Sequence, residues 1–309
     1  MPTRALRKVD TTVLRLASDR VTARALANPP ADYVGTPAAK ILTGIGRRQY
    51  LCCITRYLHR ERTEDGALRV YMSNRRACHS RLCMECSAAH SKVLVEKTRR
   101  ITAHAWAAEP SMRALFLTLT ERSAVQGQLR PTLQAHAAAI KRLFAQQRIA
   151  AAINGSISSI EVAPRLDNGR STFGVHSHHL LAVRSDYFST AQYIRQAEFV
   201  ARFQQARGLD YRPVVDVRTV QIAAAQCEAD AAHGIAVELM KYVFKPSHFI
   251  HRDGHVHVDS AVVAELALAL RNKRTHRLSG CFEVSRKALQ RATPKQRAQP
   301  HEHAEQHPF

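Results

Sequence analysis

The sequence is poor in acidic residues, and this shortage limits the partners that the protein can bind. Its 309 residues contain 25 Asp and Glu against 46 Lys and Arg, so the net charge is +21 and the pI is about 10.4. Such an excess of positive charge attracts polyanions through Coulomb steering and counterion release. We therefore expect nucleic acid as the partner. An anionic membrane as the partner, or a basic enzyme whose charge is unrelated to its partner, is the alternative.

Long apolar runs are also missing. A helix that spans a bilayer needs about 20 apolar residues, whereas the longest candidate, AVVAELALAL at 261–270, is shorter and contains Glu265. No secretory signal is visible, and Asp10 and Asp19 argue against reading the Arg-rich amino terminus as a transit peptide. We therefore expect a cytoplasmic protein with no membrane partner.

Cysteines are few, and most lie in one short stretch. Five of the seven are Cys52, Cys53, Cys78, Cys83 and Cys86. In a chain without a secretion signal, this clustering favours metal binding over disulfides. The last three have CxxxxCxxC spacing, which is typical of structural zinc. Cys53 is the first candidate for the fourth ligand and Cys52 is the alternative. His79 and His90 are candidates of lower rank. Buried reduced thiols are the alternative to zinc.

The composition divides the chain into four segments. Residues 1–45 are basic, and Pro29, Pro30 and Pro37 break any long element, which indicates an amino-terminal arm that orders on DNA. Residues 46–95 form a cysteine-rich, zinc-binding region. Residues 96–289 form one α+β domain. Residues 290–309 have almost nothing to bury, so we expect a disordered tail.

The α+β prediction depends on strands and helices that alternate along the chain. Alternating apolar residues predict strands at 114–120, 156–164, 171–183 and 213–220. Asn168-Gly169 predicts a hairpin between the second and third strands. Apolar residues at helical spacing predict four helices. They run from Pro131 onward, from Thr190 to a stop at Gly208, from 228 to 245, and from 260 to 272.

Three His-x-His triplets occur, at 176–178, 255–257 and 301–303, although chance predicts about one in a chain with this histidine content. On a strand, His176 and His178 project from one face, while Ser177 and His179 project from the other. Glu161, on the neighbouring strand of the hairpin, is a candidate third ligand. Two imidazoles and one carboxylate suit Mg²⁺ or Mn²⁺. Surface histidines with a solvated glutamate are the alternative.

A predicted helix carries a second group of reactive side chains. In GIAVELMKYVFKPS (234–247), Glu238, Tyr242 and Lys245 lie at i, i+4 and i+7, with Lys241 beside them. A tyrosine between lysines is suited to attack a phosphodiester, because the cations offset charge in the transition state. Glu238 could activate a water molecule. A tyrosine at the core margin with solvated lysines is the alternative.

These motifs resemble, in their order, the rolling-circle replication initiators of small bacterial plasmids, within the HUH endonuclease superfamily. The stretches that carry the resemblance are CHSRLCMEC (78–86), FLTLTE (116–121), SIEVAP (159–164), HSHHLLAV (176–183) and ELMKYVFK (238–245), with a weaker likeness in RLSGCFEVSRKAL (277–289). The order favours the triplet at His176, since the one at His255 follows the tyrosine motif. Two departures are Ser177, where the family has a bulky hydrophobe, and Met84-Glu85, which lacks the family's proline.

The resemblance implies an HUH-type fold, with an antiparallel sheet, flanking helices and a zinc-binding region before them. It implies that the protein binds plasmid origin DNA, as duplex and single strand, and nicks one strand. Tyr242 would form a 5′-phosphotyrosyl link and leave a 3′-OH primer, with Mg²⁺ or Mn²⁺ on His176, His178 and Glu161. Glu238 would later activate water, and a host helicase is a further candidate partner. An HUH transposase or relaxase, and a non-catalytic zinc-containing DNA-binding regulator, are the alternatives.

Overall fold

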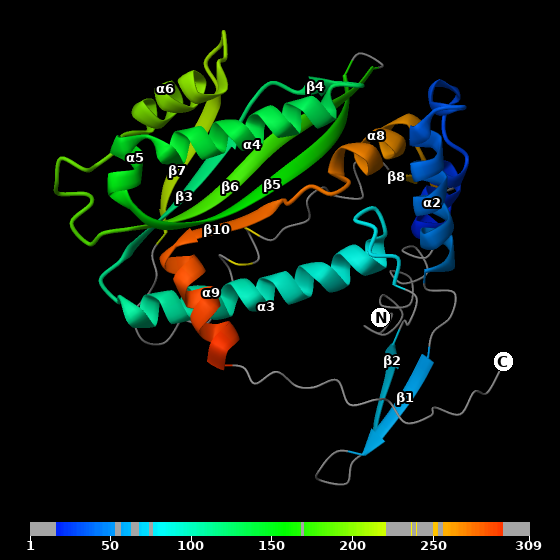
Figure 1. Cartoon of the computed structure of the whole chain (residues 1–309), viewed down its shortest axis with the longest axis horizontal. Helices are drawn as coiled ribbons and strands as arrows, with labels where there is room; N and C mark the ends of the chain where they lie inside the picture. Colours follow the sequence, from blue (N-terminus) through cyan, green and yellow to red (C-terminus); the bar gives the residue numbers. More distant parts are fainter. Residues whose placement is uncertain are drawn as a thin grey trace, which may run out of the picture.

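The computed structural model describes most of the chain outside its two ends and several internal segments. The described residues are 17–52, 57–62, 68–73, 77–167, 170–220, 236, 239, 250–252 and 256–292. They form an antiparallel six-stranded sheet with helices on both faces (Figure 1). The expected α+β class is therefore confirmed.

The sheet places the histidine strand at its centre. Its main path runs in the order β10-β5-β6-β3-β7, and the short strand β4 also pairs with β6. The bounds are β3 (Arg113–Thr120), β4 (Ala124–Val125), β5 (Ile153–Asp167), β6 (Arg170–Val183), β7 (Val214–Val220) and β10 (His276–Gly280). All pairs are antiparallel. Asp167 pairs with Arg170, so the predicted β5-β6 hairpin is confirmed, although its turn at 168–169 lies outside the described residues.

Each face of the sheet packs against its own helices (Figure 1). The larger core lies under α4 (Leu129–Ala145), with α5 (Gln147–Ala152), α6 (Gln196–Arg207) and α8 (Ser260–Leu270). The smaller core, on the opposite face, lies under α3 (Met84–Ala108) and α9 (Cys281–Ala292). Residues of β6 alternate between the two cores, because successive side chains of a strand point to opposite faces. We call these the α4 face and the α3 face.

Two helices differ from the expectation. The 25-residue helix α3 was not predicted, and two of its four buried residues are Thr98 and Thr102, so its apolar periodicity is weak. Helix α6 begins at Gln196 instead of Thr190, but it ends as predicted, since Gly208 has the left-handed conformation, with φ of 70°. Helix α4 begins at Leu129, two residues before Pro131.

The amino-terminal segment is more structured than its prolines suggest. Residues 17–27 are helical, η1 (Ala31–Tyr33) follows, and α2 (Pro37–Leu51) begins with Pro37 in its first turn. Proline is favoured there because the first turn has no partner for its N–H. Leu26 and Leu42 are fully buried in the larger core. The prolines thus separate helices instead of preventing them, while the division into four segments stays a prediction.

Two small hairpins complete the described structure. They are β1 (Tyr57–Arg62) with β2 (Leu68–Ser73), and β8 (Ile250–Arg252) with β9 (Val256–Val258). Within the described ranges, no helix combines the length and the apolar character that crossing a membrane requires.

Candidate functional site

The predicted metal ligands share the α3 face of the sheet. His176 pairs with Glu161 of β5 and with Thr120 of β3, so these three side chains project together. His178 lies two residues along the same face, and its Nε2 is 3.1 Å from Glu161 Oε2. The side chains of His178 and Glu161 are 18% and 16% exposed, so solvent still reaches the pair.

Threonines of β3 hold both imidazole rings. Thr118 Oγ1 lies 3.2 Å from His178 Nδ1, and Thr120 Oγ1 lies 2.9 Å from His176 Nδ1. Such contacts orient a metal-ligating histidine and leave Nε2 for the metal. His176 Nε2 lies over Gly174, where an added Cβ would approach it to 3.0 Å. The missing side chain at Gly174 therefore gives the His176 ring its space.

The electrostatics of the α3 face keep His176 neutral. Burial lowers the pKa of His176, and the nearby Glu161 carboxylate opposes this only in part. A neutral imidazole is the form that binds metal. The low pKa therefore suits His176 to ligation.

The structure brings two of the three predicted ligands together. Two ligands at right angles, each about 2.1 Å from one ion, lie about 3.0 Å apart, so the 3.1 Å between His178 and Glu161 fits Mg²⁺ or Mn²⁺. His176 is on the same face but is not gathered with them. Over the described residues, a single group of at least three His, Cys, Asp or Glu has all its ligand atoms within 4.8 Å of one another, and it is the cysteine cluster below.

The α4 face of the same strand carries a buried chain of hydrogen-bonding side chains. Ser177 Oγ lies 2.9 Å from His136 Nε2 and 2.9 Å from His179 Nε2. Glu121 Oε1 continues the chain, 3.1 Å from His136 Nδ1. At the other end, Ser158 Oγ lies 2.7 Å from His179 Nδ1. Ser177, His136 and His179 are fully buried, and we call these five residues the buried chain.

One assignment of protons satisfies every member of the buried chain. Ser158 donates to His179 Nδ1, His179 Nε2–H donates to Ser177, Ser177 donates to His136 Nε2, and His136 Nδ1–H donates to Glu121. Burial lowers the pKa of His179 well below its ordinary value, consistent with a neutral ring. Arg207 Nε donates to Glu121 Oε2 over 2.7 Å and balances its charge.

This chain gives Ser177 and His179 a role that the sequence did not indicate. The resembled family has a bulky hydrophobe at Ser177, and His179 projects away from the predicted metal ligands. In the structure the Ser177 hydroxyl joins two imidazoles, which a bulky hydrophobe could not do. Their partner His136 lies among the buried residues of α4, and helical spacing gives no signal for its role.

The predicted nucleophile helix is described only in part. Glu238, Lys241, Tyr242 and Lys245 lie outside the described residues. Ala236 and Leu239 are helical and buried. Leu239 belongs to the smaller core with Ala114 and Leu180. It therefore contacts the α3 face, which also carries His178. Of the rival histidine triplets, His255, His301 and His303 are outside the described residues, and of His257 only the backbone is described.

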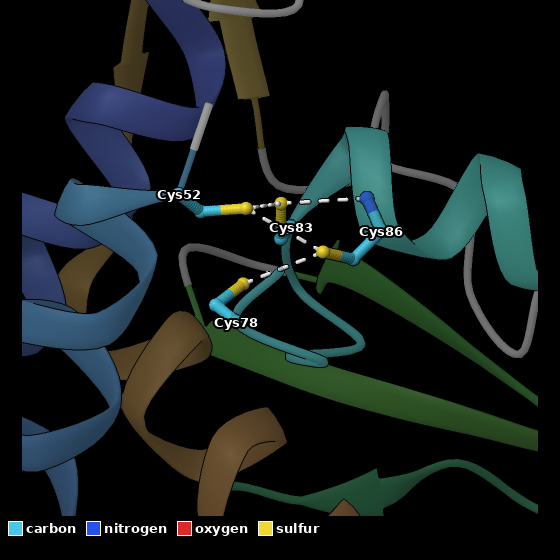
Figure 2. Close-up of side chains that lie close together, drawn as sticks. All are labelled: Cys52, Cys78, Cys83 and Cys86. Carbon is cyan, nitrogen blue, oxygen red and sulfur yellow. Dashed lines mark hydrogen bonds between the residues drawn. The ribbon is translucent and has the colours of Figure 1, made fainter. Parts of the chain in front are cut away.

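Four cysteine sulfurs converge beside the start of α3 (Figure 2). They belong to Cys52 at the end of α2, Cys78 in the preceding loop, and Cys83 and Cys86 at the start of α3. The fourth member is thus Cys52, the alternative to Cys53, which lies outside the described residues. His79 and His90 are not among the gathered ligands. Two adjacent cysteines are equivalent in sequence spacing, so the sequence alone does not choose between them, and of the two the structure describes Cys52.

The spacing of these sulfurs fits zinc. Four sulfurs, each about 2.3 Å from one tetrahedral ion, lie about 3.8 Å from one another. The sulfur atoms are separated by 3.5 Å for Cys52 to Cys86, 3.7 Å for Cys78 to Cys86 and 3.8 Å for Cys83 to Cys52. A disulfide would need about 2.05 Å. Contacts from the Cys78 and Cys83 thiols lower the pKa of Cys86 to about 2, which favours a thiolate.

A buried aspartate from the amino-terminal helix supports the cysteine cluster. Asp19 Oδ1 accepts a hydrogen bond of 2.6 Å from the backbone N–H of Met84, and Asp19 Oδ2 lies 3.4 Å from Cys83 Sγ. Burial raises the pKa of Asp19 to about 6. No sequence pattern indicated this contact, because 65 residues separate Asp19 from Met84.

Comparison with known proteins adds an independent finding. Residues 69–308 match the Rep_1 family, described as Replication protein. A protein named Protein rep from Streptococcus pneumoniae serotype 2 is 32% identical over 231 residues, which cover 74% of this chain and 68% of that protein. A Protein rep from Lentilactobacillus hilgardii is 32% identical over 228 residues, covering 74% and 70%. A Replication protein from Staphylococcus aureus is 26% identical over 195 residues, covering 62% and 80%. No solved structure matches the chain.

Proposed function

Because the chain belongs to the Rep_1 replication protein family of plasmid rolling-circle replication initiators, we propose that it starts replication by binding its plasmid origin and nicking one DNA strand. The observation that carries this proposal is the pairing of His178 and Glu161 on the α3 face of a central antiparallel strand. The charge of +21 supports a nucleic-acid substrate, both as duplex and as single strand. Recruitment of a host helicase stays a prediction.

The proposed reaction is an exchange of phosphodiester for phosphotyrosine. The Tyr242 phenolate attacks the scissile phosphorus, the bond from phosphorus to the 3′ oxygen breaks, and that oxygen takes a proton. One DNA end is then a 5′-phosphotyrosyl link and the other is a free 3′-OH. Lys241 and Lys245 offset the negative charge of the transition state. Glu238 later removes a proton from water, which ends the cycle.

The chain's own ligands for a divalent ion are His178, Glu161 and His176. When bound there, Mg²⁺ or Mn²⁺ would supply Lewis-acid polarisation of the scissile phosphate. Thr118 and Thr120 orient the two rings through Nδ1. Solvent access to His178 and Glu161 leaves room for phosphate oxygens beside them.

The place of Leu239 supports Tyr242 as the nucleophile. Leu239 belongs to the smaller core, together with Leu180 and Ala182 of β6. Tyr242 follows Leu239 by three residues, a length of chain that spans at most about 11 Å. We therefore propose that the Tyr242 phenol attacks a phosphate held at the α3 face.

The decisive test uses origin-containing supercoiled plasmid with Mn²⁺, scored for nicked product and for covalent protein-DNA adducts. We expect both from the natural protein and neither from Tyr242→Phe, which removes only the attacking oxygen. Tyr211→Phe is the matched control, since its hydroxyl accepts a hydrogen bond from the backbone of Arg122. An adduct formed by Tyr242→Phe would exclude Tyr242 as the nucleophile. Binding without nicking by the natural protein would favour the non-catalytic regulator.

We propose further that Cys52, Cys78, Cys83 and Cys86 bind a structural zinc ion. The adjacent cysteines provide a matched pair of variants. Cys52→Ser should reduce bound zinc from about one ion per chain to nearly none, whereas Cys53→Ser should leave it unchanged. Metal analysis of the purified proteins measures this directly. Loss of zinc in Cys53→Ser alone would reverse the assignment.

A further inference from the structure

A cavity of about 380 Å³ lies beside the cysteine cluster, outside the proposed catalytic site. It is bounded by α2, by the loop that follows Cys78, and by α8 with the turn after it. Arg48, Cys78, His79, Arg81, Arg271 and Asn272 are among the residues that line it. Its volume is within the range of small-ligand sites. We call it the arginine cavity.

The charges in the arginine cavity all have one sign. Arg48, Arg81 and Arg271 line it, and no Asp or Glu does. Arg81 is held in place because its Nη2 donates to the backbone carbonyl of Lys273. Its Nη1 is buried and has no hydrogen-bond acceptor among the residues that the structure describes. A buried guanidinium N–H without an acceptor is costly, so the site favours an anion.

The backbone around the arginine cavity is strained. Across the described residues, only His79 and Asn272 are non-glycine residues with positive φ, at 54° and 58°. Both line this cavity. Such conformations cost free energy, and they concentrate where a site is shaped for a ligand.

Strand β10 connects the surroundings of the arginine cavity to the α3 face. Burial, together with the charges of Arg81 and His90, lowers the pKa of His276 to about 4, so His276 is neutral and lies within reach of the Arg81 charge. His276 pairs with Ser159, which in turn pairs with His178. Directly paired residues share a face, and two strand spacings amount to about 10 Å. The side chain that the Arg81 charge reaches therefore lies two strands away from the proposed metal ligand His178.

We infer that the arginine cavity binds a backbone phosphate of the DNA strand, outside the scissile bond. The arginines supply charged donors for phosphate oxygens. Leu82, Leu266 and Leu270 give the cavity an apolar floor for the attached sugar. The inference rests on the proposed function, because it assumes a DNA substrate. Since Cys78 also lines the cavity, zinc on the cysteine cluster would fix the loop that carries Arg81.

The test compares binding of a single-stranded origin oligonucleotide at several salt concentrations. Arg48 and Arg271 are exposed, so a double Arg48→Ala, Arg271→Ala variant should fold. We expect about tenfold weaker binding for each lost charged hydrogen bond. The slope of log K against log salt should fall by about 0.7 for each lost phosphate contact. Arg184→Ala, Arg218→Ala is the control, since this double variant removes the same two charges from exposed residues that pair with Asp186 and Asp216.

Three outcomes separate this inference from the proposed function. An unchanged affinity and salt slope in the double variant would overturn the inference, while adducts at Tyr242 would still support nicking. Equal losses in the double control variant would overturn it as well, because the loss would then depend only on overall charge. If the natural protein neither binds nor nicks DNA, thermal stabilisation by inorganic phosphate that is lost in the double variant would show an anion site without a DNA substrate, and the inference would fail.

A second variant addresses the arginine that is partly buried. Arg81→Lys keeps the positive charge. The lysine ammonium lacks the planar guanidinium, which can donate to the Lys273 carbonyl and to a phosphate at the same time. We expect weaker binding of the oligonucleotide together with an unchanged zinc content. Unchanged binding by Arg81→Lys would remove Arg81 from the phosphate site.

Discussion

Strand β6 carries histidines on both of its faces, and these histidines differ in their exposure and in the groups that their rings contact. On the α4 face, His179 is fully buried, and both ring nitrogens have hydrogen-bond partners within the buried chain. On the α3 face, His178 is partly exposed and meets a carboxylate. Residues one position apart in sequence therefore have opposite roles, one structural and one available for chemistry.

The comparison shows how this sheet tolerates polar residues in its core. The buried chain is stable because each member has a partner, and Arg207 balances the charge of Glu121. On the α3 face, by contrast, the side chains of His178 and Glu161 are partly exposed, and we propose that they bind a cation. We expect substitutions on the α4 face to lower stability and substitutions on the α3 face to lower activity.

The substitution His178→Ala should cause the largest change, which is a loss of nicking activity. Loss of a metal ligand should reduce nicking of supercoiled DNA by about a thousandfold or more, because Lewis-acid assistance contributes several kcal/mol. The free energy of unfolding should change by less than about 1 kcal/mol, since the pair with Glu161 is partly exposed. Duplex binding serves as the control and should persist. Parallel loss of nicking and stability would make His178 structural.

His136→Ala should have the opposite effect, with a large loss of stability and little loss of nicking activity. Removing the imidazole leaves Glu121 and Ser177 buried without their partner and opens a cavity, which together should lower the free energy of unfolding by about 3 to 5 kcal/mol. Denaturant titration measures this loss. Nicking by the remaining folded protein should be largely retained. If stability were unchanged, the buried chain would have no structural role.

Ser177→Ala should lower the stability by less than His136→Ala does. It removes the hydroxyl that joins His136 and His179 but keeps the volume nearly constant, so we expect a loss of about 1 to 3 kcal/mol in unfolding free energy. Ser177→Leu, which restores the bulk usual in the resembled family, should cost more than Ser177→Ala, because it adds crowding to the same loss. A more stable Ser177→Leu protein would show that packing outweighs the hydrogen bonds here.

The smallest expected effect is a change in how the free energy of unfolding depends on pH. The pKa of His179 is lowered in the folded state, so the unfolded chain binds the proton more readily. Stability from this group is present above the unfolded pKa of about 6.5 and falls as the pH is lowered. The slope is at most about 1.4 kcal/mol per pH unit. His179→Gln should flatten the dependence between pH 6.5 and 5, measured by urea unfolding. An identical slope in this variant would mean that His179 already ionises normally.

Most of the fold was predictable because its signals are local. Alternating residues located β3, β5, β6 and β7, and Asn168-Gly169 predicted the hairpin that joins the long central strands. Helix α3 escaped prediction since its buried stripe is half threonine. The helical amino-terminal segment escaped because its prolines interrupt the pattern, although Pro37 suits the first turn of a helix.

The candidate site was predictable in part, for the same reason. A period of two places His176 and His178 on one face and Ser177 and His179 on the other, and the structure has this arrangement. The pairing of Glu161 with His176 follows from the hairpin register. The catalytic roles of Tyr242, Glu238 and the two lysines stay predictions, since those residues lie outside the described structure.

The sequence by itself determined the α+β class, the central histidine strand, the cysteine spacing and the family, since these depend on local periodicity and motif order. Only the tertiary structure decided that Cys52 completes the cysteine cluster, that Asp19 supports it, and that Ser177 joins His136 to His179. The contacts of Cys52 with Cys83, of His136 with Ser177 and of Asp19 with Met84 connect residues 31 to 65 positions apart. Their geometry depends on how helices pack against the sheet, and short-range patterns carry no information about that packing.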